Sequence, residues 1–126
     1  VNKHYNKEGK FPNIAVFTGI DGWMYIIDTD SITKETVLGP NYKKVYPKPA
    51  QLFRYEIGPS ISTPIIVGDK IIAAGYRGLH LFTFDEKMNV KLTDNFVATF
   101  EATPFVYNGK IYIASRNGFL YCFGDK

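Results

Sequence analysis

Lysine, arginine and tyrosine side chains in two kinds of segment are the residues of this chain best suited to binding a ligand. One segment, residues 39–49, interleaves lysines and tyrosines with prolines, and the other kind is a short turn that carries an arginine. Aromatic rings stack on sugars or bases and cations attract anions, so both kinds of segment suit a polar or anionic ligand. The candidate ligand-binding residues are Tyr42, Lys43, Lys44, Tyr46, Tyr76, Arg77 and Arg116.

The simpler interpretation of residues 39–49 is an extended, solvated loop that joins two strands, and this interpretation is favoured. Its three prolines withhold backbone N–H groups from any ladder. Function nevertheless concentrates on loops held by a rigid framework. If the chain binds a ligand, this loop and the turns around residues 76–77 and 116–117 are therefore the first places to look.

The acidic and histidine residues lack the spacing that metal binding requires. Residues 28–31 begin like a calcium loop, but the sixth and twelfth positions hold Thr33 and Gly39 instead of glycine and glutamate. We expect a turn there. His4 and His80 have no partner at metal-ligand spacing, and His80 is expected to pack inside a strand.

The cysteine and the tryptophan are also expected to have structural roles. Cys122 is the only cysteine, so no internal disulfide forms, and we expect it to be a small buried hydrophobic residue. Trp23 aligns with apolar residues of the repeat described below, which favours core packing over ligand stacking. No Gly-x-Ser-x-Gly elbow, P-loop or acid–base pair of carboxylates is present. We therefore predict no catalytic residue, no metal site and no cofactor.

Composition indicates one folded domain with a core. The chain has 126 residues, of which 45% are hydrophobic and 16% aromatic, which is too apolar for a disordered chain. The formal net charge is +3, a milder excess than nucleic-acid-binding domains carry, so we expect no nucleic-acid partner. No run of apolar residues is long enough to cross a membrane as a helix.

An internal repeat organises the chain. Residues 63–79 and 103–119 match without gaps, and their glycines Gly78 and Gly118 lie 40 residues apart. A third, partial copy covers residues 15–26 and is followed by an insertion, since Gly22 lies 56 residues before Gly78. A period of about 40 residues made of short strands is typical of a propeller blade.

Each unit reads as short strands joined by tight turns. Glycine and asparagine in these turns supply the positive φ that hairpins need, and β-branched and aromatic residues lie between them. The second unit predicts strands near residues 65–67, 71–74, 79–84 and 96–100, with at most one helical turn between 85 and 94. Pro64 and its counterpart Pro104 precede the first strand of their units, where an edge strand tolerates proline.

Continuous apolar runs indicate that these sheets are covered on both sides. Residues 71–74 and 111–114 show no alternation of apolar and polar side chains. A hairpin with one solvated face would alternate. Stacked sheets therefore explain the pattern, and the fixed period favours blades over a sandwich.

The repeated pattern Thr-Pro, three apolar residues, Lys, three apolar residues and a later Gly resembles the PQQ-like β-propeller repeat. That repeat occurs in quinoprotein alcohol dehydrogenases, in outer-membrane assembly lipoproteins of the BamB type and in other bacterial surface propellers. The resemblance covers most of residues 11–123. It implies an all-β, partial β-propeller of about three four-stranded antiparallel blades, of which the first and last are incomplete.

The blade units are expected at residues 11–60, 61–100 and 101–126. The resemblance implies a ring of six to eight blades, so we expect the chain to be a fragment that needs missing blades or self-association to close the ring. Such unpaired end blades would expose large apolar faces.

The function implied by the resemblance is a non-catalytic scaffold that binds a protein or a glycan, in the periplasm or at the cell surface. Two alternatives remain open at this point. One is part of a PQQ-dependent dehydrogenase, although the calcium site and vicinal cysteine pair of such enzymes are missing here. The other is an accessory propeller of a larger hydrolase. Binding of PQQ with calcium and reconstituted dye reduction would distinguish the enzyme from the scaffold.

Overall fold

The chain folds into three small antiparallel sheets. The computed structural model describes residues 13–38 and 45–124, and the side chains of residues 30–49 lie outside that description. Within these ranges there are ten strands and no helix, which confirms the all-β prediction. The strands are β1 (Ile14–Thr18), β2 (Trp23–Leu38), β3 (Val45–Glu56), β4 (Ile65–Val67), β5 (Lys70–Gly75), β6 (Gly78–Phe84), β7 (Val90–Phe96), β8 (Phe105–Tyr107), β9 (Lys110–Ala114) and β10 (Leu120–Phe123).

The middle sheet has four strands in the order β4-β5-β6-β7. Its first three strands lie where the sequence predicts them. The prediction of a fourth strand at residues 96–100 is wrong, because β7 begins at Val90 and ends at Phe96. The Asp85 carboxylate explains the earlier start, since it accepts backbone hydrogen bonds from Lys87 and Asn89 at 2.9 Å and turns the chain back immediately.

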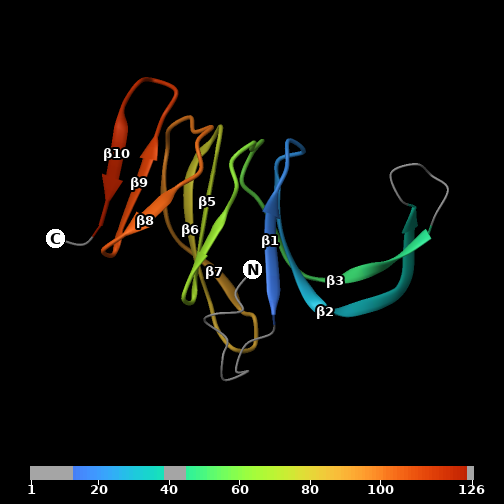
Figure 1. Cartoon of the computed structure of the whole chain (residues 1–126). Helices are drawn as coiled ribbons and strands as arrows, with labels where there is room; N and C mark the ends of the chain where they lie inside the picture. The colour runs from blue at the N-terminus through green and yellow to red at the C-terminus, as the bar shows by residue number, and fades with distance from the viewer. Residues whose placement is uncertain (1–12, 39–44, 125–126) are drawn as a thin grey trace.

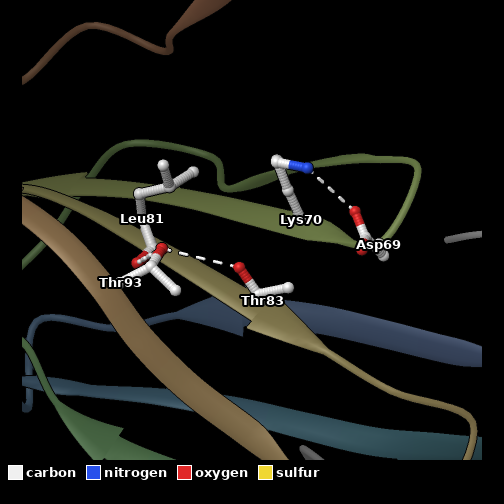
Figure 2. A network of polar contacts seen from close by, with 5 residues as sticks. All are labelled: Asp69, Lys70, Leu81, Thr83 and Thr93. Atoms are coloured by element: carbon white, nitrogen blue, oxygen red, sulfur yellow. Dashed lines mark hydrogen bonds and ion pairs between the residues drawn. The ribbon is translucent and has the colours of Figure 1, made fainter.

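A bulge on β7 is accommodated by a hydroxyl group. The register shifts between Leu81 and Phe82, which pair with Asp94 and Leu92, so Thr93 is the extra residue. Figure 2 shows Thr93 beside Leu81 and Thr83; its hydroxyl donates to the Leu81 carbonyl at 3.1 Å. At the other side of this sheet, the ammonium of Lys70 pairs with Asp69 at 3.0 Å in the β4–β5 turn.

Three sheets stack in a row, with one hydrophobic core in each gap (Figure 1). The first sheet, ordered β1-β2-β3, shares a core with the middle sheet, and the middle sheet shares a second core with the last sheet, ordered β10-β9-β8. Burial of these side chains is the main source of stability for such small sheets. The fully buried members include Ile14, Met24, Ile26, Ile71, Phe82, Phe100 and Ile113.

Strand β5 is buried on both faces. Ile71 and Ala73 belong to the first core, whereas Ile72 and Ala74 belong to the second. Because successive side chains of a strand point to opposite faces, a strand between two cores has no polar position. The predicted two-sided cover is therefore confirmed for residues 71–74. It is wrong for the equivalent residues 111–114, where Ala114 is exposed.

Strand β2 is longer than the sequence predicts. Residues 28–31 lie inside β2, so the predicted turn there is wrong, and residues 45–49 belong to β3 instead of a loop. Beyond residue 28, β2 pairs only with β3, and Figure 1 shows this two-stranded arm running away from the other sheets. Pro47 and Pro49 are tolerated because β3 is an edge strand.

The first and last sheets each have three strands within the described ranges. The last sheet ends with β10 at its edge and contains no counterpart of β7 there. In the first sheet, β1 corresponds to β5, and it forms the edge opposite to β3.

Candidate binding surface

The turns that carry the predicted arginines lie at one end of the stacked sheets. We call this end the turn edge; it comprises the β1–β2, β5–β6 and β9–β10 turns and the connecting segments 57–63 and 97–103. Figure 1 shows the three turns together at the top of the molecule. Short connections hold the turns, so their side chains project from a fixed framework.

Backbone hydrogen bonds tie each turn to the connecting segments in a repeated way. The N–H of Tyr76 donates to Pro59 and the N–H of Arg116 donates to Thr99, both at 3.0 Å. The two donor residues are 40 residues apart, and so are the two acceptor residues, which matches the repeat. The Gly75 carbonyl likewise accepts from Phe100 at 3.0 Å. The turn edge is therefore a rigid surface because its backbone groups are paired.

Arg77 lies across the connection between the first two sheets. Its guanidinium lies 3.7 Å from the Glu56 carboxylate, and both side chains are largely exposed. The stem of Arg77 needs a glycine beneath it: a Cβ atom at Gly58, whose φ is +88°, would lie 2.6 Å from the Arg77 side chain. The absence of a side chain at Gly58 therefore leaves room for the Arg77 stem, and the charge of Arg77 stays in solvent.

Arg116 lies in the corresponding turn of the last sheet, at the repeat position of Tyr76 rather than that of Arg77. Its Nε lies 3.4 Å from the Glu101 carboxylate, again with both side chains exposed. Desolvation, followed by a hydrogen bond with Glu101, raises the pKa of the Tyr76 phenol above its usual value. Tyr76, Glu101 and Arg116 thus form one polar group in which a neutral phenol lies beside an ion pair.

Two open hollows flank these side chains. One, of about 440 Å³, is lined by Ala98, Thr99, Arg116 and Asn117. The second, of about 210 Å³, is lined by residues 16–18 and 60–64, at the other side of the middle sheet. Ligand sites that enclose small molecules are deep and mostly apolar, whereas these are shallow and mixed in polarity. The surface is therefore suited to contact with a large partner rather than to enclosure of a small one.

The chemistry available at the turn edge is hydrogen bonding and ion pairing. The carboxylates of Glu56 and Glu101 face arginines, whereas that of Asp21 accepts hydrogen bonds from Trp23 and Tyr25. No group of three His, Cys, Asp or Glu side chains gathers as a metal site among the described residues. Each Arg–Glu pair is exposed, so it contributes little to stability and its partners are free to exchange for those of a ligand.

The sequence-predicted site residues have different outcomes. The structure brings Tyr76, Arg77 and Arg116 to one edge. Tyr42, Lys43 and Lys44 lie outside the described residues, and Tyr46 lies on β3 with its side chain outside the description. Sequence reasoning missed Glu56 and Glu101; the signal available was that each lies just before or within a segment that connects two units.

The predictions for three other residues are also decided by the structure. His80 is 9% exposed and packs parallel to Phe82 at 6.3 Å between ring centres, which confirms the prediction that it packs inside a strand. The prediction for Cys122 is wrong, because its side chain is exposed. Trp23 is half-buried outside both cores, with the Arg54 guanidinium 4.6 Å from its ring centre, so core packing is wrong too.

The length of the turns explains both errors. The middle sheet turns through Tyr76 and Arg77 alone, since Gly75 pairs with Gly78. The β9–β10 turn contains one more residue, because Ser115 N–H bonds to the Phe119 carbonyl, and the β1–β2 turn closes in the same way between Gly19 and Trp23. One added residue moves every following side chain to the opposite face.

Comparison of the chain with protein-family models and with curated proteins gave no match. No helix in the described ranges is long and apolar enough to span a membrane. The function is therefore argued from the geometry of the stacked sheets and of the turn edge.

Proposed function

We propose that this chain is a segment of a PQQ-like β-propeller that acts as a non-catalytic scaffold and binds a protein partner at its turn edge. The localisation that accompanies this proposal is the periplasm or the cell surface. The proposal has two parts, the propeller arrangement and the binding surface, and each is supported by a separate observation.

Contacts between equivalent residues carry the first part. The N–H of Thr63 donates to the Thr103 hydroxyl at 3.2 Å, and the Ser62 hydroxyl donates to the Ala102 carbonyl at 2.8 Å. Both bonds join positions one 40-residue period apart, just before β4 and β8, which are edge strands of their sheets. Blades arranged around an axis bring equivalent inner positions together, whereas sheets of a sandwich need not.

Arrangement of charge supports the second part. Two arginines at equivalent turns, each with a carboxylate from a connecting segment, present alternating charges along a rigid edge. Protein interfaces use such patterns to fix orientation and select partners. Arginine and tyrosine are also enriched among the residues that dominate binding energy. A protein partner is favoured over a glycan because both hollows are shallow.

A photo-crosslinking experiment tests the proposal. p-Benzoylphenylalanine placed at Arg77 should form an adduct with one protein in an extract of the source organism, and Arg116→Glu in the same chain should abolish that adduct. The control position is Glu86, an exposed residue in the β6–β7 turn at the other end of the sheets. Equal adducts at both positions would reject the turn edge as the binding surface.

Two further measurements separate the alternatives. Specific binding on a glycan array, with no protein adduct, would assign the edge to glycans instead. Saturable binding of PQQ with calcium, accompanied by dye reduction, would identify an enzyme and overturn the scaffold proposal.

A further inference from the structure

Each sheet of this chain has two faces that can be told apart. We call the face toward the following sheet in the chain the exit face, and the face toward the preceding sheet the entry face. At the first junction, the exit face of the first sheet meets the entry face of the middle sheet. The residues of this junction are Ile14, Val16, Met24 and Ile26 on the exit side and Ile71, Ala73, Phe82 and Phe84 on the entry side.

The second junction repeats the first. Here the exit face of the middle sheet meets the entry face of the last sheet. The exit side is formed by Ile65, Ile72, Ala74, Leu79 and Leu81, and the entry side by Val106, Ile111, Ile113, Tyr121 and Phe123. One chain therefore builds the same kind of junction twice.

Cross-strand pairs fix which positions are equivalent. Thr18 pairs with Met24, Ala74 pairs with Leu79, and Ala114 pairs with Leu120 at the turn end of the three sheets. Directly opposed residues share a face of the sheet. Leu120 is therefore the counterpart of Met24 and Leu79, both of which are buried on exit faces.

The exit face of the last sheet is open. Its members Phe105, Tyr107 and Leu120 are 63%, 63% and 72% exposed. Tyr112 lies between them, opposed to Phe105 on one side and to Cys122 on the other. The equivalent face of the middle sheet is covered by a sheet of this same chain, which shows what kind of surface fits here.

The entry face of the first sheet is the complementary open face. Phe17, which is 45% exposed, stacks on Tyr25 at 5.1 Å between ring centres. Trp23 lies two residues before Tyr25 and so on the same face, with Arg54 over its ring at 4.6 Å. This face carries aromatic side chains like the entry faces of the other sheets.

We propose that the open exit face of the last sheet binds the open entry face of the first sheet of a second copy of this chain. The contact continues the series of junctions already built within the chain. A second copy is the occupant that the observations favour, because the described residues present one open face of each kind and an exit face meets an entry face at both junctions within the chain. An association of unlike faces is head-to-tail.

Mass measurement of the purified chain by light scattering tests the proposal. The expected mass is that of two or more chains, and a single-chain mass up to the solubility limit would overturn it. Leu120→Asp alters the exit face and Phe17→Asp alters the entry face. Each should weaken association by at least about tenfold, because an unpaired charge is costly in an apolar contact. Glu86→Lys, at an exposed position in the β6–β7 turn, is the control and should leave association unchanged.

The two variants also distinguish unlike from like faces. If two exit faces paired with each other, Phe17→Asp would still associate, and that result would overturn the proposal. In the head-to-tail arrangement neither variant associates alone, but a mixture of the two regains one intact contact and forms a heterodimer. Failure to regain association on mixing, with both variants folded by circular dichroism, would also contradict it.

Fluorescence of Trp23 supplies a second measurement of association. It is the only tryptophan and lies on the entry face. Its emission should shift to shorter wavelength as the chain concentration rises, because association removes the ring from water. The shift should be lost in Leu120→Asp, which is altered at the opposite end of the molecule. A shift that persists in Leu120→Asp would contradict the proposal.

Discussion

Gly78 illustrates how one residue closes the β5–β6 hairpin and also contacts the next segment. Its φ is +134°, and a Cβ atom would lie 2.3 Å from the backbone oxygen of Phe96. Conformation and close approach therefore both require glycine at this position. Gly109 also has a positive φ, +73°, but nothing lies within 4 Å of a Cβ atom placed there.

The pair separates the two effects in a stability measurement. Gly78→Ala should lower the free energy of unfolding by about 3 kcal/mol or more, because strain of the positive φ adds to a clash with backbone. Gly109→Ala should cost only about 1 kcal/mol, from the φ alone. Urea denaturation measures both, and equal losses would show that the approach to Phe96 is not tight.

His80 makes stability depend on pH. Burial lowers the pKa of its imidazole below the usual value of 6.5, so the folded state holds the neutral form. Below about pH 6.5 the unfolded chain binds the proton more readily than the folded one, so stability falls as pH decreases. The stability contributed by the neutral imidazole is fully present above about pH 6.5.

Replacement of the imidazole tests this linkage. His80→Phe should reduce the loss of stability between about pH 7.5 and about pH 5.5, because the variant has no proton to take up at this position. The urea midpoint at the two pH values measures the difference. An unchanged pH dependence in the variant would show that His80 is not the group responsible.

At the scale of elements, β5 is the strand on which both cores depend. Its successive side chains enter alternate cores, so it has no face on which truncation is tolerated. Strand β4 differs, because its last residue, Val67, is 40% exposed.

Truncation on each side of β5 should therefore be equally damaging. Ile71→Ala and Ile72→Ala should each lower the free energy of unfolding by about 2–4 kcal/mol, because each leaves a cavity in one core. Val67→Ala should cost less than about 1 kcal/mol, since its side chain already contacts water. Urea denaturation of the three variants provides the comparison; a small loss at Ile72 alone would show that the second core is loosely packed.

At the scale of the whole molecule, each sheet depends on its neighbours for cover. The middle sheet is covered on its exit face by the last sheet and by Phe100 from the connecting segment. Phe100 is fully buried and bridges to Ser115. Removal of the last sheet therefore exposes a face that the intact chain keeps from water.

A chain that ends at residue 97 should show the consequence. Its Ile72, Ala74 and Leu79 side chains lose their cover, so it should bind the dye ANS more strongly than the intact chain and unfold at a lower temperature. Dye fluorescence and thermal denaturation measure these changes. A shortened chain that matches the intact one in both would contradict stacking as the main source of its stability.

Local sequence determined the repeat of this protein and the approximate places of the strands and turns in its repeated hairpins. Runs such as 71–74 and the turn at Gly78 encode their conformation through β-branching and positive φ, and both are read from neighbouring residues. The two-sided burial of β5 follows from the absence of polar positions in it. Arg77 and Arg116 were found because they occupy equivalent turns of the repeat.

Only the tertiary structure decided which face of the sheet each side chain occupies after a turn, and which residue it contacts there. One extra residue in the turns before Trp23 and Leu120 moves Trp23 and Cys122 out of the cores, and sequence alignment of the repeat does not reveal that shift. Glu56 and Glu101 meet their arginines only when the connecting segments lie against the turns. Adjacent residues set the conformation of a hairpin. The face of the sheet that a side chain occupies, and the residue that it contacts, depend instead on how distant segments pair.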